Sequence, residues 1–151
     1  MVDVVPPAVR SRMMAGIRSK DTAPEIKLRR GLHALGFRYR LNVKELPGKP
    51  DLVFPRRRAV IFAHGCFWHG HDCHLFVWPK SRAKWWKDKI ERNKSVDGRS
   101  IEALAGVGWR IGIVWECAMK GRTRRPLDSV IDSCASWLRS DEPRLELRGL
   151  D

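Results

Sequence analysis

Cysteine and histidine side chains are concentrated in one short stretch of the sequence. Cys66, His71 and Cys73 fall within eight residues, and Cys117 follows a predicted strand at residues 110–115. Thiolate and imidazole are the ligands that zinc prefers, and four of them complete a closed structural site. Their spacing is not that of a standard zinc finger. It predicts a zinc ion that fastens an otherwise irregular loop to the end of a core strand.

Other interpretations of these residues stay open at the level of sequence. Cysteines are often small buried hydrophobic residues, and we assign that role to Cys134, which lies on the apolar stripe of a predicted helix. His69 and His74 flank His71 and compete with it as the fourth ligand. A catalytic zinc held by His64, His69 and His71, with an open position for water, is a further alternative. We favour the closed site because a cysteine-rich ligand set leaves no vacancy for water.

An acidic residue and two histidines next to this stretch indicate hydrolytic chemistry. Asp51 follows a turn proline and opens a predicted strand, as in the PD-(D/E)xK nucleases, where the carboxylate meets a magnesium ion and the scissile phosphate. The second acid and the lysine of that motif are missing, because the next strand ends in Ala63 and His64. An imidazole titrates near pH ~6.5, so His64 or His69 can take the proton instead. The alternative is a solvated aspartate with two structural histidines.

The elements that position these groups can be predicted from periodicity and turn residues. We expect helices at residues 22–35, 82–95, 100–105 and 127–138, and strands at residues 51–54, 59–64 and 110–115. Residues 65–79 show neither helical nor strand periodicity. Few strands with helices before and after them indicate a compact α/β or α+β layer, in which helices flank a small mixed sheet.

The charge of the chain predicts a polyanionic partner. Among 151 residues, 30 are Lys or Arg and 17 are Asp or Glu, which gives a net charge of +13. Such an excess favours nucleic acid, although a basic tail alone would produce the same number. The sequence shows neither an apolar run of membrane-spanning length nor a secretory signal. Four cysteines without an export signal indicate a reducing compartment, so we expect a cytoplasmic, nucleoid-associated protein.

Three motifs resemble those of the very-short-patch repair (Vsr-type) DNA mismatch endonucleases. They are Pro50-Asp51, the run from Ala59 to His69 that contains His-Gly-Cys-Phe-Trp-His, and Val114-Trp115-Glu116-Cys117-Ala118, and the likeness extends over residues 9–138. The resemblance implies a PD-(D/E)xK restriction-endonuclease-like α/β fold and a nick in one strand of duplex DNA beside a T:G mismatch. Such mismatches arise when 5-methylcytosine deaminates. We expect an N-terminal arm at residues 1–20, which by the resemblance contacts DNA, an endonuclease domain at 21–139, and a tail at 140–151 that lies outside the likeness.

The same resemblance implies roles for individual residues. Asp51 would bind magnesium and His69 would act as the general base, with Glu25 and His64 assisting at the phosphate. Cys66, His71, Cys73 and Cys117 would hold the zinc ion. The second magnesium ligand of the family falls at Ala63, where other members often carry threonine. Alanine has no side-chain oxygen, so only its backbone carbonyl can serve. For Glu25 the alternative is the third position of a capping box that starts with Thr22.

Aromatic residues fall into two groups. Trp109, Trp115 and Trp137 lie in or beside apolar patterns and are predicted core residues. The resemblance implies that Phe67, Trp68 and Trp86 wedge between base pairs from the major groove and that Met14 does so from the minor groove. Ordinary packing is the alternative for each. Basic residues around them are candidate phosphate contacts: Lys80, Arg82, Lys84, Lys87, Lys89, Arg92 and Lys94.

The sequence therefore predicts a magnesium-dependent nicking endonuclease with a structural zinc ion. Its expected partner is double-stranded DNA with a T:G mismatch, on which it acts as a monomer without a small-molecule cofactor. One rival is a zinc-containing DNA-binding module that does not depend on Asp51. The other is a nuclease of the same fold that cuts matched DNA.

Overall fold

A five-stranded mixed sheet forms the centre of the molecule. The computed structural model describes residues 22–150, and its strands follow the order β1-β2-β3-β4-β5. β1 to β3 pair antiparallel, whereas β3, β4 and β5 run parallel. The strands are Arg40–Leu41 (β1), Leu52–Phe54 (β2), Ala59–His64 (β3), Arg110–Trp115 (β4) and Arg144–Leu147 (β5). The expected small mixed sheet flanked by helices is confirmed, and β3 and β4 have the predicted bounds.

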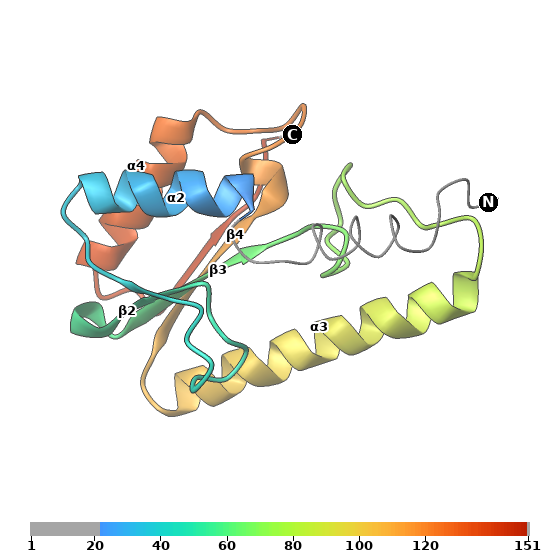
Figure 1. Ribbon diagram of the computed structural model, residues 1–151, viewed down its shortest axis with the longest axis horizontal. Coiled ribbons are helices and arrows are strands. Elements are labelled where there is room, and N and C mark those ends of the chain that lie inside the picture. Colours follow the sequence, from blue (N-terminus) through green and yellow to red (C-terminus); the bar gives the residue numbers. More distant parts are fainter. Residues whose placement is uncertain (1–21, 151) are drawn as a thin grey trace, which may run out of the picture.

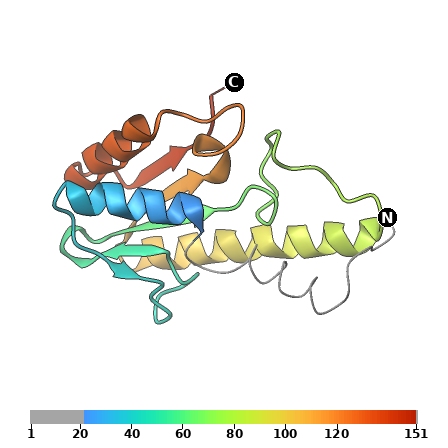
Figure 2. The same ribbon diagram turned by 45° about the horizontal axis from the view of Figure 1, so that its top comes forward.

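Helices cover both faces of this sheet (Figures 1 and 2). The helices are α2 (Ala23–Ala34), α3 (Ala83–Gly106) and α4 (Leu127–Arg139), with short 3-10 turns η1 (Pro55–Arg57) and η2 (Glu116–Ala118). α2 and α4 pack against each other on one face, and α3 lies across the other. In no described segment is a helix both long and apolar enough to cross a lipid bilayer.

Alternation along β3 divides the core into two parts. Ala59 and Ile61 face the side covered by α2 and α4, where they join a buried cluster with Leu28 and Val130. Successive side chains of a strand point to opposite faces, so Val60 packs with the α3 side of the core. The burial of the apolar residues Ala59 to Phe62 follows from this two-sided cover.

The sequence signals at the ends of α2 have their expected effect. Thr22 is the N-cap, and the Glu25 amide donates to its Oγ1 over 3.4 Å. Gly36 follows the helix with φ +95°, a conformation that side chains with a Cβ rarely adopt. The predicted helix at residues 22–35 is therefore confirmed to within a residue at each end.

The prediction of two helices at residues 82–95 and 100–105 is wrong. A single helix of 24 residues, α3, runs through the segment between them. Gly98 costs about 1 kcal/mol relative to alanine, which does not break a helix that is packed on both sides of this glycine. Ile90 and Leu104 provide that packing and are both buried. Because the helix is continuous, residues 96–99 are helical and do not form a connecting loop.

The sheet continues into residues that the sequence analysis assigns to a tail. Arg144–Leu147 form β5, an edge strand parallel to β4. Leu147 is buried, and Trp115 Nε1 donates to Glu146 Oε2 over 2.7 Å. The structural domain thus extends beyond residue 139. Four residues with alternating charge and leucine give too short a pattern to predict a strand against the surrounding polar sequence.

Candidate active site and metal cluster

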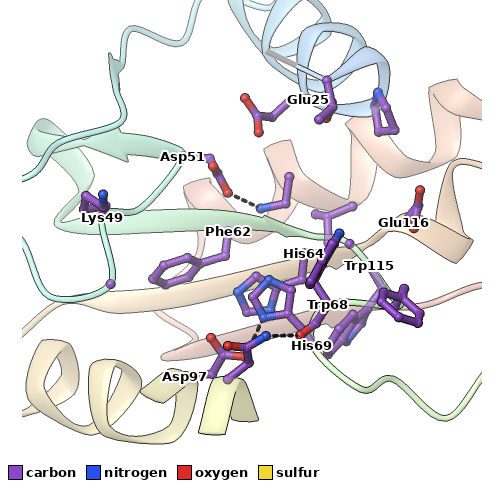
Figure 3. Close-up of a pocket in the computed structure, with 18 of the residues that line it drawn as sticks. Glu25, Lys49, Asp51, Phe62, His64, Trp68, His69, Asp97, Trp115 and Glu116 are labelled. Carbon is purple, nitrogen blue, oxygen red and sulfur yellow. Dashed lines mark hydrogen bonds and ion pairs between the residues drawn. The ribbon is translucent and has the colours of Figure 1, made fainter. Parts of the chain in front are cut away.

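One cleft collects most of the residues that the sequence analysis singled out. It lies where β2 begins and where β3 and β4 end, between α2 and α3. Figure 3 shows Glu25 and Asp51 on one side of β3, with His64, His69 and Asp97 on the other. The lining also includes Ala63 and the aromatic residues Phe67, Trp68 and Trp86.

Two carboxylates face each other at the α2 side of the cleft. Asp51 Oδ2 accepts a hydrogen bond of 2.7 Å from the Ala63 amide, and Glu25 is buried beside it. Burial and, after it, the nearby Glu25 carboxylate together raise the pKa of Asp51 to about 7, although the hydrogen bond from the Ala63 amide opposes both effects. Two acids with little solvent repel each other unless a proton or a cation lies between them. This pair can therefore hold a divalent metal ion.

His69 is held by an acidic residue that sequence reasoning missed. Its Nδ1 lies 2.6 Å from Asp97 Oδ2, which comes from the middle of α3. A carboxylate that accepts from Nδ1–H leaves Nε2 as the proton-accepting nitrogen. The pair therefore has the geometry of a general base with its orienting acid. No local motif marks Asp97, and only the continuity of α3 brings it to the cleft.

His64 stacks on His69 and remains neutral. The two rings lie 3.9 Å apart at an angle of 9°. Burial lowers the pKa of His64 well below its usual value, and its buried Nδ1 finds no hydrogen-bond partner among the described residues. His64, His69 and Asp97 are close enough to share a metal ion. Stacked parallel rings direct their in-plane lone pairs side by side, however, rather than toward a common point, which favours the base-and-acid arrangement.

A second group brings together the four predicted zinc ligands. The ligand atoms of Cys66, His71, Cys73 and Cys117 all lie within 4.8 Å of one another. His71 Nδ1 is 3.5 Å from Cys66 Sγ and 3.6 Å from Cys117 Sγ. The catalytic alternative that grouped His71 with His64 and His69 does not form, because His71 turns into the cysteine cluster.

Two other residues that compete at the sequence level lie elsewhere. His74 is not among the four clustered residues, although it follows Cys73 directly. Cys134, on the buried face of α4, is fully buried in the core, as predicted. The distinction between His71 and His74 depends on how the loop folds back, which spacing alone does not reveal.

Parallel pairing of β3 and β4 explains how the cluster assembles. His64 and Trp115 are register partners at the end of both strands, so the residues that follow them emerge at the same edge. The Cys117 amide donates to Cys66 Sγ over 3.3 Å, and the Cys66 amide donates to Glu116 Oε1 over 3.1 Å. Burial raises the pKa of the Cys66 and Cys117 thiols, so thiolates there need a cation.

The aromatic residues expected to contact DNA form one cluster. Phe67 lies 5.2 Å from Trp68 and 5.3 Å from Trp86 between ring centroids, and Trp68 lies 5.7 Å from Trp86. All three are half-buried at the cleft, whereas Trp85 is 46% exposed. Met14 and the arm lie outside the described residues. Trp115 and Trp137 are buried, and half-buried Trp109 packs against the α3 side of the core, as expected.

Comparison with known proteins identifies the family. Residues 2–75 match the family model "DNA mismatch endonuclease Vsr". The chain is 48% identical over 134 residues to the type II nicking enzyme V.XorIIP of Xanthomonas oryzae pv. oryzae, which covers 85% of this chain and 98% of that protein. It is 42% identical over 138 residues to the DNA mismatch endonuclease Vsr of Escherichia coli strain K12, with 91% and 88% covered.

A third relative is the type II nicking enzyme V.NmeAIP of Neisseria meningitidis, 41% identical over 122 residues that cover 81% of this chain and 87% of the relative. The class that the cleft and these relatives define is that of the DNA-nicking endonucleases. Within it, the chain belongs to the Vsr family of DNA mismatch endonucleases. The resemblance stated from the motifs is thereby confirmed.

Proposed function

We propose that this protein uses magnesium to nick one strand of duplex DNA beside a T:G mismatch, on a fold of the PD-(D/E)xK type. One observation carries the proposal. The Glu25–Asp51 carboxylates and the His69–Asp97 pair line the same cleft, and the aromatic cluster of Phe67, Trp68 and Trp86 lies at it. One bound DNA duplex could therefore contact the carboxylates that would hold a cation, the base, and the aromatic rings that would insert at a weakly stacked base pair.

The backbone at Ala63 supports its assignment as a magnesium ligand. In an antiparallel pair the amide and the carbonyl of one residue face the same neighbour. The Ala63 amide donates to the side chain of Asp51, which directly precedes β2, so the Ala63 carbonyl faces the same side. An alanine at this position therefore does not remove the second oxygen ligand. Magnesium held by Asp51 and this carbonyl would supply charge stabilisation at the scissile phosphate.

His69 is the proposed general base. Asp97 holds its Nδ1 proton, so Nε2 can accept a proton from the attacking water and the imidazolium is stabilised by the carboxylate. Buried, neutral His64 supports the His69 ring from beneath and adds no charge that would oppose its protonation. Glu25 keeps the Asp51 side of the cleft acidic, which favours cation binding.

The cysteine cluster fits a structural zinc ion. Zinc lies about 2.3 Å from sulfur and about 2.0–2.1 Å from nitrogen, so a tetrahedral site separates the two ligand atoms by roughly 3.6 Å. The observed separations from His71 Nδ1 to Cys66 and Cys117 are 3.5 and 3.6 Å. Zinc would fix the loop that carries Phe67, Trp68 and His69 between two of its ligands.

The aromatic cluster is the proposed contact with the mismatched base pair. Inserting rings between base pairs requires unstacking, which is least unfavourable at a mispair. The exposed basic residues of α3, among them Lys87, Arg92 and Lys94, would contact phosphates on either side. We further propose that the arm at residues 1–20 reaches the minor groove with Met14, and that one copy of the chain acts alone.

The test compares wild type with Asp51→Asn on labelled duplexes, matched or with one T:G pair, with and without Mg²⁺. We expect the wild type alone to nick the T:G duplex, and only with Mg²⁺. Binding without cleavage by both proteins would favour the non-catalytic module. Equal cutting of matched DNA would favour a general nuclease.

A further inference from the structure

The residues after β5 run directly over the cysteine cluster. The Gly149 amide donates to Cys117 Sγ over 3.3 Å, and the Leu150 amide donates to the Thr123 carbonyl over 2.7 Å. Arg125 Nε donates to the Arg148 carbonyl over 2.6 Å. In Figures 1 and 2 the red segment that follows β5 lies beside the orange loop that follows η2. This segment, residues 148–150, is called the C-terminal strap below.

The strap also reaches the histidine of the cluster. Arg148 Nη1 lies 2.9 Å from Asp72 Oδ1, and its Nη2 donates to the Asp72 carbonyl over 2.9 Å. Asp72 Oδ1 in turn lies 3.6 Å from His71 Nε2. A metal-bound histidine commonly has a carboxylate on its other nitrogen, which fixes the ring. Here Arg148 holds that carboxylate in place from a different part of the chain.

The close approach of the strap requires glycine at position 149. A Cβ there would overlap Thr123 Oγ1 and would lie 2.6 Å from the Cys117 carbonyl oxygen. Any larger residue must therefore move the strap away from Cys117 and lengthen the bond from its amide to the sulfur. Glycine is required here because of these close contacts and not because of its backbone φ angle.

We propose that Arg148 and Gly149 are positioning residues of the zinc cluster and set how tightly it holds its metal. The inference rests on the proposed zinc site. Three thiolates and one imidazole around Zn²⁺ carry a net negative charge, and buried Cys66 and Cys117 have little solvent to offset it. The Gly149 amide supplies a donor to one thiolate, and the Arg148 guanidinium supplies a positive charge through Asp72.

The strap thereby acts on the DNA-cleaving loop without touching substrate. Cys66 and His71 enclose the residues that carry the base and two wedge rings, namely Phe67, Trp68 and His69. If the strap sets the stability of the metal cluster, it also sets how rigidly this loop is held. Residues 148–150 are far from the cleft in sequence yet belong to its support.

The experiment measures zinc transfer from loaded protein to excess chromogenic chelator. The variants are Gly149→Ala and Arg148→Gln, and the matched controls are Gly106→Ala, where a Cβ meets nothing within 4 Å, and Arg144→Gln, at the exposed start of β5. Loss of an outer partner typically lowers metal affinity by about 10–100-fold. We expect release at least about tenfold faster in both variants and unchanged release in both controls.

A second measurement separates metal positioning from general packing. Thermal unfolding is compared for the metal-free and zinc-loaded forms of each protein, and cobalt-substituted protein is titrated by its visible absorption bands. We expect Gly149→Ala to lose part of the stabilisation by zinc and to bind cobalt more weakly. Equal loss of stability in both forms, with unchanged release, would show a packing role only and would overturn the proposal.

Different results would refute the zinc site and the role of the strap. If wild-type protein retains neither zinc nor cobalt, the zinc site itself is wrong and this inference falls with it. If wild type binds one ion and both variants release it like their controls, the zinc site stands and only the role of the strap is refuted. Arg148 is partly exposed, so Arg148→Gln folds even if Gly149→Ala does not.

Discussion

His69 Nδ1 and Asp97 Oδ2 lie 2.6 Å apart although 28 residues separate them in the chain. One belongs to the irregular loop after β3 and the other to the middle of α3. The loop is placed by the cysteine cluster and the helix by the α3 side of the core. The contact between His69 and Asp97 therefore requires that both the loop and the helix are correctly placed. Replacing Asp97 tests whether His69 acts as the base.

Replacing the orienting acid should disable catalysis but not binding. Asp97→Asn keeps the shape of the side chain but can present an N–H to His69, which favours the wrong tautomer. We expect single-turnover nicking of a T:G duplex to fall by roughly 10²–10⁴-fold, with duplex affinity changed less than about threefold. Asp88→Asn, at an exposed position of the same helix, is the matched control. A nicking rate within about twofold of wild type would remove Asp97 from the mechanism.

The raised pKa of Asp51 predicts how metal-free stability depends on pH. The folded-state pKa is about 7 against an ordinary value of 3.8. Between these values the folded state binds more protons than the unfolded state, so this group lowers the free energy of unfolding as pH rises from about 4 to about 7. In the wild type this decline in the free energy of unfolding should amount to a few kcal/mol in order of magnitude, and we expect it to be absent from Asp51→Asn. Denaturant unfolding with chelator at pH 5 and pH 8 measures it.

The comparison must be made as a difference between the two proteins. His64 has a lowered pKa, so its contribution has the opposite sign and is lost as pH falls. That contribution is present in wild type and variant alike. Parallel stability curves for the two proteins across this range would contradict the assignment of Asp51 as a proton-binding group.

Loss of a cluster ligand should act through the loop rather than the sheet. Cys117→Ala is expected to purify without stoichiometric zinc and to lose both nicking and mismatch binding, because the loop with Phe67, Trp68 and His69 is released. Cys134→Ala removes a buried thiol of the core instead. It should lower the melting temperature yet keep one zinc per chain by elemental analysis. Zinc loss from both variants alike would argue against a specific cluster.

Adjacent tryptophans on α3 give a matched test of the wedge. Trp86 contacts both Phe67 and Trp68, whereas Trp85 is exposed and packs on Arg82. We expect Trp86→Ala to lower the preference for T:G over matched duplex by about tenfold or more, since stacking of one base on an aromatic ring contributes about 1–3 kcal/mol. Trp85→Ala should change overall affinity slightly and preference not at all. Competition binding with the two duplexes measures both quantities.

Sequence alone located the parts of this site that short-range patterns encode. The apolar runs of β3 and β4 had clear limits, and the four residues that could hold a metal ion were recognisable by type. Asp97 could not be found in this way, because its role depends on a helix that continues through Gly98 and on packing across the sheet. The short edge strand β5 depends likewise on a partner strand that is distant in sequence.

Glu25 shows why two interpretations of one residue need not compete. Its backbone amide bonds to the N-cap Thr22, as a capping motif predicts, while its buried carboxyl lies against Asp51. Main chain and side chain of one residue act at different places. Sequence patterns describe the first, and only the arrangement of α2 over β2 determines the second.

Parallel pairing of β3 with β4 has a mechanical consequence. If the aromatic cluster inserts between base pairs as proposed, the distorted DNA would pull on the loop, and this load would pass through Cys66 into β3 and through the cysteine cluster into β4. The two strands are joined by six consecutive register pairs from Ala59–Arg110 to His64–Trp115. A pull along the strands loads these pairs together in shear rather than opening them one after another. The sheet would therefore resist such a load while one strand is cut.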